Sequence, residues 1–234
     1  MIHQLIFAAP KPNMTIQAFQ DYWVNVHAVN YASKIPQIKK YLVDTRIPFE
    51  GDLGTPLLPY QGVAEIWIEL EDQIASLQSK EFLQGARLDE PNWAAFWMTF
   101  VMDTSTHVII EETALTSKPS RIKLLILLKR KSGIPLENFR QYHLKVHAPI
   151  VSKLQGLRRY QQCHTVDGAY VIGESAWFDG AELLWFDDIT TLKQAIASEQ
   201  FQTHIKASLD NFVNPQYIFS MVTEEHWIIG SEAD

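Results

Sequence analysis

The pattern of apolar and polar positions predicts strands and helices in a fixed order. An apolar run at residues 2–9 is closed by Pro10 and Pro12, which is typical of a strand that ends before a turn. Apolar side chains at helical spacing follow over residues 15–33, which predicts a helix with Thr15 as its N-cap. The positions expected to form its buried stripe are Phe19, Tyr22, Val26 and Val29.

The rest of the pattern completes a β-α-β-β-α-β unit and then repeats it. In the first unit we expect strands near 38–46 and 62–70, a helical region over 72–98 broken near Pro91, and a strand near 106–113. The second unit is expected to contain a strand at 121–131, a helix near 135–153 with Pro135 in its first turn, strands near 157–166 and 181–187, a helix near 189–212 and a strand at 219–229.

Four sequence anchors recur in the same order at a nearly constant offset. Residues 19–28 match 139–148, 33–41 match 152–160, 67–69 match 185–187, and 107–110 match 226–229. Such recurrence is the signature of an internal repeat. We therefore predict two α+β units, residues 1–113 and 121–234, joined by a polar connector at 114–120.

Several predicted strands are apolar on both faces, for example at residues 126–128 and 183–186. A ferredoxin-like β-α-β-β-α-β unit carries its helices on one face of the sheet, so the other face needs a separate cover. The second copy can supply that cover at high effective concentration because the connector is short. We expect an α+β fold in which two antiparallel sheets face each other as an intramolecular dimeric α+β barrel.

Composition and charge narrow the class of protein. The net charge of −7 and the pI near 5.6 argue against a nucleic-acid surface, which needs basic residues to displace counterions. The single cysteine, Cys163, excludes an intrachain disulfide framework and a CxxC motif, and we expect it to be a buried, inert thiol. Without a signal-peptide pattern or a membrane-length apolar stretch, we expect a cytoplasmic protein with no membrane contact.

The repeated motif resembles that of the EthD family of dimeric α+β-barrel proteins. It reads Phe-x-x-Tyr-Trp-x-x-x-His-Ala at residues 19–28, followed by Ser-Lys-hydrophobic, a tyrosine, and Trp-hydrophobic-acid. Most members of that family carry one unit and dimerise, so this chain resembles a tandem version. The family includes proteins that accompany alkyl-ether degradation, lactone isomerases of aromatic catabolism, and polyketide-pathway dehydratases or cyclases. The resemblance implies a cavity for a small apolar or aromatic molecule, without implying one reaction.

The candidate catalytic residues are two histidine–tyrosine pairs. His27 and His147 each lie eight residues after a helix phenylalanine, at the border of the buried stripe, and Tyr41 and Tyr160 follow on the next strand, where the family carries a pocket tyrosine. Imidazole titrates near neutral pH and a phenol can stabilise an oxyanion, which suits acid–base chemistry. The alternative is that both histidines are buried structural residues. If only one half is active, we expect the second.

The two copies diverge where Trp23 is replaced by His143, which gives His143-x-x-x-His147 on one helical face. A zinc-protease glutamate and a third ligand are missing, so we expect a more polar second pocket rather than a metal site. The residues expected to bind substrate are His143, Trp23, Tyr22, Tyr142, Trp67, Trp185 and His164. Tyr22 and Tyr142 are expected to form the wall of the barrel rather than to react.

Other polar and loop residues receive simpler interpretations. We expect Asp44, Arg46 and Asp167 to be solvated strand ends, with Glu65 a possible inward carboxylate. Long loops at 48–59 and 167–177 are hypothesised to fold over a pocket, because they contain Phe49, Tyr170 and Trp177.

Three functions remain open from the sequence. The leading hypothesis is a cofactor-free enzyme of isomerase, lyase or cyclase type that acts on a hydrophobic, aromatic or polyketide-like metabolite. The second is a non-catalytic accessory protein that binds a hydrophobic metabolite, and the third is a cofactor-free or haem-using monooxygenase. A Walker or Rossmann glycine motif is missing, so we expect no nucleotide. The tandem barrel is a possible homodimer.

Overall fold

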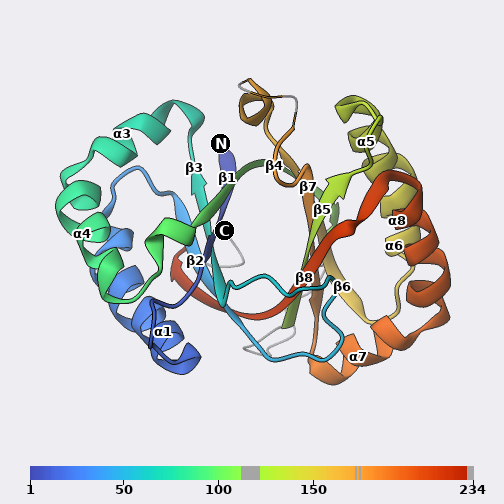
Figure 1. The fold of residues 1–234 in the computed structure, drawn as a ribbon, viewed down its shortest axis with the longest axis horizontal. Helices are drawn as coiled ribbons and strands as arrows, with labels where there is room; N and C mark the ends of the chain where they lie inside the picture. The colour runs from blue at the N-terminus through green and yellow to red at the C-terminus, as the bar shows by residue number, and fades with distance from the viewer. Residues whose placement is uncertain (112–121, 172, 174, 231–234) are drawn as a thin grey trace. The chain divides into compact units, whose positions relative to one another are not determined.

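A computed structural model describes residues 1–111, 122–171, 173 and 175–230, so the predicted connector at 114–120 lies outside the described residues. Over these described residues the fold is mixed α+β, with eight strands in an antiparallel closed barrel of order β1-β3-β2-β8-β5-β7-β6-β4 (Figure 1). The expected fold class is therefore confirmed.

Each half of the chain follows the predicted β-α-β-β-α-β order. The first half contains β1 (Ile2–Ala8), α1 (Ile16–Tyr22), α2 (Ala28–Asn30), β2 (Lys40–Arg46), β3 (Gly62–Ile68), α3 (Gln73–Gln78), α4 (Arg87–Asp89) and β4 (Phe100–Ile110). The second half contains β5 (Ile122–Arg130), α5 (Leu136–Tyr142), α6 (Ala148–Val151), β6 (Leu157–Thr165), β7 (Gly180–Phe186), α7 (Ile189–Ala197), α8 (Lys206–Phe212) and β8 (Val213–Ile229).

The helices are divided by π-helical turns. These turns span Trp23–His27, Phe82–Ala86, His143–His147 and Gln200–Ile205. A π turn bonds residue i to i+5, so every later position is rotated relative to a regular α-helix. Val29 is 44% exposed, and its predicted place in the buried stripe is wrong for this reason, while Ala28 and Ala32 are buried instead.

The predicted start of the first helix is confirmed. Thr15 has extended backbone angles, and its hydroxyl accepts a hydrogen bond from the backbone N–H of Ala18 at 3.2 Å. Pro135 lies one position earlier than predicted, at the N-cap of α5 rather than within the first turn.

The contacts divide the chain into two compact units. Unit 1 comprises Met1–Arg46, Pro59–Thr104 and Glu225–Asp234, and unit 2 comprises Ile47–Leu58 and Ser105–Glu224. Strands β4 and β8 each contribute residues to both units, and the loop after β2 belongs to unit 2.

In each unit, one strand lies between two others, and the strand pairing places an acidic residue near its middle. In unit 1, Glu65 of β3 lies opposite Leu5 of β1 and Leu42 of β2. In unit 2, Glu182 of β7 lies opposite Ile126 of β5 and Gln162 of β6. Both carboxyl groups are at most 1% exposed, so each must find polar partners within the fold.

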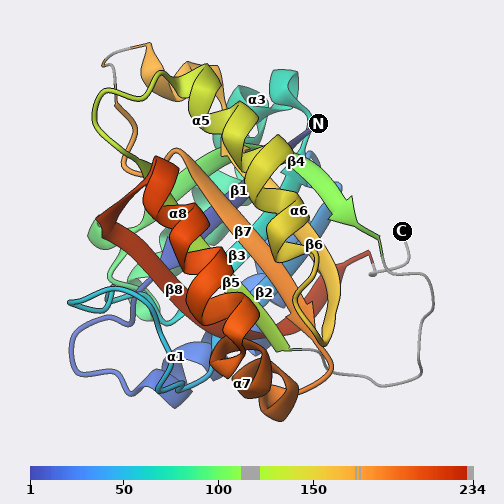
Figure 2. The ribbon, with the colours of Figure 1, turned by 90° about the vertical axis from the view of Figure 1, so that its right-hand side faces the viewer.

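The core of unit 2 packs α5, α6, α7 and α8 against one face of β5, β6 and β7, and Figure 2 shows α6 and α8 side by side over these strands. Its large buried side chains are Leu124, Leu128, Phe139, Tyr160, Phe186, Phe201 and Phe212. Among the described residues, none of the helices is long and apolar enough to cross a membrane.

Candidate functional site

Unit 1 contains a partly open cavity of about 110 Å³ between its sheet and its helices. Strands β1, β2 and β3 supply one wall, and the two helical segments supply the other. The lining is Ile6, Ala8, Trp23, His27, Ala32, Ile35, Ile38, Tyr41, Ala64, Ile66, Phe82, Ala86, Glu90, Trp93, Ala94 and Thr99. The cavity is therefore apolar and aromatic, with few groups that can take part in proton transfer.

His27 is held in this lining by a buried carboxylate. Its Nδ1 lies 2.9 Å from Asp89 Oδ2, and the His27 and Trp93 rings are 4.7 Å apart. Asp89 also accepts hydrogen bonds from the Tyr22 hydroxyl at 2.8 Å and from Asn92 Nδ2 at 3.0 Å. His27 is the last residue of the π turn that begins at Trp23, and Asp89 is the last residue of α4. The two helix ends therefore orient these side chains toward each other.

The electrostatics of this pair favour a neutral imidazole beside an ionised carboxylate. Burial lowers the pKa of His27 and outweighs the opposing effect of Asp89. Burial alone would raise the pKa of Asp89, but hydrogen bonds from Asn92, His27 and Tyr22 lower it. Burial and the bond to Asp89 raise the pKa of Tyr22 to about 12. Nδ1–H of His27 therefore donates to Asp89, which leaves the lone pair on Nε2.

Tyr41 supplies a hydroxyl to the same cavity. Its side chain is 1% exposed, and burial raises its pKa, so the phenol stays protonated. Trp23 also lines the cavity, and it opposes the effect of burial on the pKa of Tyr41.

The structure thus brings the predicted residues His27, Tyr41 and Trp23 into one cavity. Tyr22 contacts Asp89 instead of lining it. Asp89, Asn92 and Trp93 were missed because the sequence predicted only a broken helix there. The signal that could have found them is the polar–aromatic stretch around Pro91, where a short 3-10 turn at Glu90–Asn92 ends the helix.

Trp67 takes part in a separate cluster of unit 1. Its ring stacks on His3 at 4.2 Å and on Trp227 at 6.0 Å, and His3 Nε2 lies 2.7 Å from Glu65 Oε2.

Asp44 of β2 was expected to be a solvated strand end, and that interpretation is wrong. The side chain is 0% exposed, because β2 is covered along most of its length. The carboxyl groups of Asp44, Glu65 and Glu225 lie within 4.8 Å of one another.

In unit 2 the equivalent helix carries a buried network centred on Glu182. His143 Nε2 lies 3.0 Å and His147 Nε2 3.3 Å from Glu182 Oε1, and the Tyr160 hydroxyl donates to the same oxygen. Gln162 Nε2 donates to the Tyr160 oxygen at 2.6 Å. These five side chains are at most 1% exposed.

The network continues from both histidines. His143 Nδ1 is 3.1 Å from His164 Nε2, and His147 Nδ1 is 2.9 Å from Ser208 Oγ. Burial lowers the pKa of His143, and burial together with the neighbouring His143 lowers that of His164 to about 2. Burial would raise the pKa of Glu182, but His147 and His143 together lower it. Glu182 is thus the charged centre of this network, with His143 and Tyr160 as its hydrogen-bond partners.

Four of the predicted residues, His143, His147, Tyr160 and His164, meet in this network. Sequence reasoning missed Glu182 because strand alternation alone does not show which polar residue is buried. Tyr142 lies apart from it and accepts a hydrogen bond from Asn211. Trp185 also lies elsewhere, with Lys123 Nζ 5.0 Å and the Arg159 guanidinium 4.6 Å from its ring.

Cys163 is buried, as expected, with its sulfur 3.6 Å from the Thr106 hydroxyl. Phe49, from the first long loop, packs against the core of unit 2.

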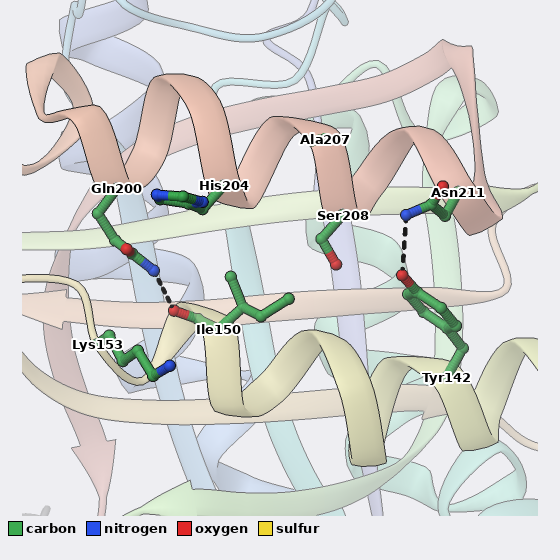
Figure 3. A pocket seen from close by; sticks show the side chains of 8 residues that line it. All are labelled: Tyr142, Ile150, Lys153, Gln200, His204, Ala207, Ser208 and Asn211. Carbon is green, nitrogen blue, oxygen red and sulfur yellow. Dashed lines mark hydrogen bonds between the residues drawn. The ribbon is translucent and has the colours of Figure 1, made fainter.

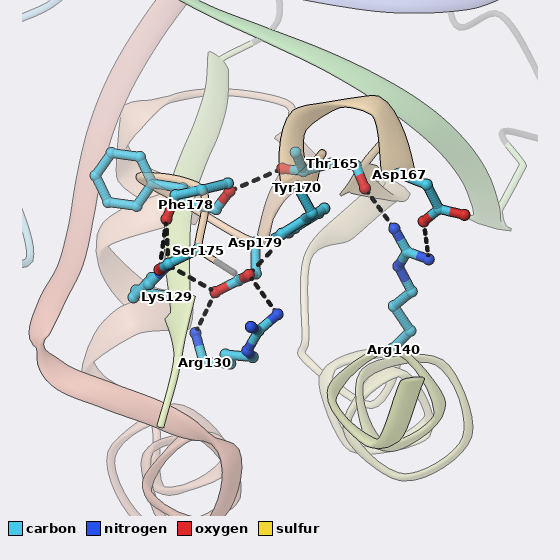
Figure 4. A network of polar contacts seen from close by, with 10 residues as sticks. Lys129, Arg130, Arg140, Thr165, Asp167, Tyr170, Ser175, Phe178 and Asp179 are labelled. Atoms are coloured by element: carbon cyan, nitrogen blue, oxygen red, sulfur yellow. Dashed lines mark hydrogen bonds and ion pairs between the residues drawn. The ribbon is translucent and has the colours of Figure 1, made fainter. Parts of the chain in front are cut away.

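A polar network anchors the second long loop (Figure 4). The Tyr170 hydroxyl donates to Asp179 Oδ1 at 2.8 Å, and Arg130 binds the same carboxylate at 3.0 Å. Asp167 is exposed, as expected, and pairs with Arg140 at 2.7 Å.

The comparisons identify a domain family and similar folds. The family described as EthD domain matches residues 11–96 and 131–216, whereas no curated protein matches the chain. An anthrone oxidase-like protein has a TM-score of 0.61 at 10% identity, and a putative monooxygenase from Fusobacterium nucleatum has 0.58 at 8%; each match covers 97% of this chain and 92% of the other. An EthD family protein from Bacillus halodurans is 22% identical over 44% of this chain and 95% of its own, with a TM-score of 0.36.

Proposed function

Because the chain belongs to the EthD domain family, with two copies of that domain, we propose that it is a small-molecule enzyme whose active site is the unit 1 cavity. The observation that carries the proposal is the His27–Asp89 pair at the wall of an apolar cavity. A histidine oriented by a buried carboxylate is the arrangement that enzymes use for a general base.

The cavity limits the substrate to a small apolar or aromatic molecule. Its volume of about 110 Å³ is below the range of roughly 300–1,000 Å³ that is usual for drug-sized ligands. Trp23 and Trp93 contribute aromatic surface to its lining. The substrate also needs an acidic C–H or O–H bond and an oxygen that gains charge when the proton leaves.

The geometry supports proton transfer at one nitrogen. His27 Nε2 removes the substrate proton, while Asp89 holds Nδ1–H and stabilises the imidazolium that forms. The Tyr41 hydroxyl donates to the oxygen where negative charge develops. Return of the proton to a different atom, or loss of a leaving group, gives the isomerase, lyase or cyclase chemistry expected from the sequence, with no cofactor required.

Oxidation is a second candidate, favoured by the names of the similar folds. An anthrone oxidase-like protein and a putative monooxygenase share the fold over most of their length. Proton removal by His27 from a phenol or an activated methylene would leave an electron-rich anion, and dioxygen could then oxidise that anion. Both candidates begin with the same proton transfer, and they differ only in oxygen consumption.

The test uses 5-nitrobenzisoxazole, a small aromatic molecule whose ring opens when a base removes its C–H proton. We expect the protein to accelerate ring opening and His27→Gln to reduce the rate by about 10²-fold to 10⁴-fold, the usual contribution of a general base. The matched control is His204→Gln, an exposed histidine of unit 2, which should retain the rate.

Equal rates in the wild-type protein and His27→Gln would remove His27 from the mechanism. Binding of the probe, measured by nuclear magnetic resonance, without any acceleration would favour the accessory binding protein instead. Oxygen uptake in the presence of a small phenol, lost in His27→Gln, would favour oxidation.

A further inference from the structure

A groove of about 340 Å³ runs between α6 and α8 of unit 2, outside the site described above (Figure 3). Ser208 lies at its base, and Figure 3 shows the serine hydroxyl directed into the space between the two helices. Tyr142 and Asn211 line one end of the groove, while Ile150 and Gln200 line the other.

Behind the serine lies a histidine with a carboxylate on its far side. Ser208 Oγ is 2.9 Å from His147 Nδ1, which is hydrogen-bond distance, and His147 Nε2 is 3.3 Å from Glu182 Oε1. His147 is 0%, Glu182 1% and Ser208 3% exposed, so water does not compete for these contacts. The first contact is a hydrogen bond, and the second is a charge contact that falls outside hydrogen-bond geometry. Together they follow the order nucleophile, base and orienting acid of an activated serine.

The charge on Glu182 decides which ring nitrogen of His147 acts as the base. The carboxylate also accepts from His143 and Tyr160, and these donors favour its ionised form. A hydrogen on His147 Nε2 is stabilised beside that negative charge, so the lone pair is on Nδ1, facing Ser208. The serine can then donate its hydroxyl hydrogen to Nδ1.

A donor for a developing oxyanion is available in the same groove. Asn211 Nδ2 donates to the Tyr142 oxygen at 3.0 Å, and the phenolic hydrogen of Tyr142 can therefore turn toward the groove. In Figure 3 the Ser208 hydroxyl points into the gap between the helices, and the Tyr142 hydroxyl enters the same gap from the opposite side.

We propose that Ser208, His147 and Glu182 form a second catalytic site, in which Ser208 is the nucleophile that cleaves small carboxylic esters bound in the groove between α6 and α8.

The reaction has two balanced steps. Ser208 Oγ bonds to the acyl carbon while its proton passes to His147 Nδ1, and the ester C–O bond breaks as that proton moves to the departing alcohol. Water then gives a proton to His147 Nδ1 and bonds to the acyl carbon. The bond from Oγ to the acyl carbon breaks, the proton returns to Ser208, and the carboxylic acid is released. Tyr142 donates to the carbonyl oxygen in both tetrahedral intermediates.

The test is covalent labelling of the full chain with a fluorophosphonate, followed by mass spectrometry of the peptides. The reagent bonds to activated serine oxygens and releases fluoride. We expect one adduct, on Ser208, and its loss in Ser208→Ala. Ser198→Ala is the matched control, because the Ser198 hydroxyl donates to the Ala195 carbonyl and accepts from the Phe201 backbone N–H instead of contacting a base. A second readout is p-nitrophenyl acetate hydrolysis, which Ser208→Ala should abolish.

Dependence on the histidine separates an activated serine from an ordinary one. His147→Gln is expected to slow labelling of Ser208 by at least about 10²-fold. If this variant fails to fold, Glu182→Gln provides the same comparison, because it removes the charge that orients His147. Absence of an adduct on Ser208 in the wild-type protein, or equal labelling in a folded His147 or Glu182 variant, would overturn the proposal. The outcome is independent of the His27 site, which is assayed by proton removal rather than by labelling.

Discussion

Trp23 and His143 occupy equivalent positions in the two repeats, yet the two side chains create different surroundings. The indole of Trp23 packs against Phe19 and Trp93 and helps to line an open cavity. The smaller imidazole of His143 binds both Glu182 and His164. A single exchange therefore accompanies the change from an apolar cavity in unit 1 to a buried polar network in unit 2.

At the residue scale we predict the effect of Asp89→Asn on the proposed base. The carboxylate raises the pKa of His27 against the larger effect of burial, so its removal should lower that pKa further. Proton removal needs neutral His27, and the rate is lost as pH falls through the His27 pKa. The acid limb of the pH–rate profile should therefore move to lower pH in Asp89→Asn. The plateau rate should fall by about 10²-fold or more, since an amide also allows the wrong tautomer.

Tyr22→Phe is the control for that measurement. It removes one of the hydrogen bonds to Asp89 and leaves the carboxylate in place, so the change in the profile should be small. An acid limb that stays in place or moves to higher pH in Asp89→Asn would contradict the assignment.

The sequence predicted the histidines and tyrosines of both sites because they recur at equivalent positions of the repeat. The carboxylates were harder to predict. Asp89 lies in an irregular helix end, and Glu182 lies on a strand whose other residues are apolar. In both cases only the tertiary structure shows that the carboxylate is buried beside a candidate histidine. The groove serine, Ser208, had no sequence signal, because a helical serine is common and its partner is 61 residues away.

At the scale of elements, π turns direct the functional side chains. Trp23–His27 and His143–His147 are π-helical and carry the candidate histidines. The turn at Phe82–Ala86 supplies residues to the same cavity as Trp23 and His27. The sequence predicted where the helical regions begin and end, but it did not predict their interruptions at Ser79 and Ser198, where the backbone is extended. It did not predict the extra residue in each turn, because hydrophobic spacing over a few residues does not separate an α turn from a π turn.

We predict that deletion of Asn25 converts the π turn of the first helix into a regular α turn. Asn25 is exposed, so its loss removes little packing, but it rotates His27 relative to Asp89. Ring opening of 5-nitrobenzisoxazole should fall to the level of His27→Gln, while far-ultraviolet circular dichroism retains the helical signal. Asn25→Ala keeps the number of residues and should keep the rate. Full activity in the deletion variant would show that the π turn does not position His27.

At the scale of the whole chain, both units bury neutral histidines. Burial lowers the pKa of His27 in unit 1 and of His143 and His164 in unit 2. The unfolded chain binds protons at these residues below about pH 6.5, whereas the folded chain does not. The free energy of unfolding therefore falls as pH drops from neutral toward the lowered folded pKa values.

Urea unfolding at pH 7.5 and 5.5 measures this loss. His164 alone should contribute about 1.4 kcal/mol between the two values, because its folded pKa lies far below both. The unfolding midpoint should therefore be lower at pH 5.5, and His164→Gln should reduce the difference. A midpoint that is unchanged, or higher at pH 5.5, would contradict the neutral state of these histidines.

The composition of unit 1 has a consequence for synthesis on the ribosome. Thr45 Oγ1 lies 2.8 Å from His226 Nε2, and Trp67 stacks on Trp227, so the segment from Glu225 onward completes the half of the protein that is translated first. During synthesis, unit 1 therefore stays incomplete until Ser105–Glu224 of unit 2 has been translated. A premature stop at residue 225 would leave unit 2 complete and remove from unit 1 the end of β8, from Glu225 to Ile229.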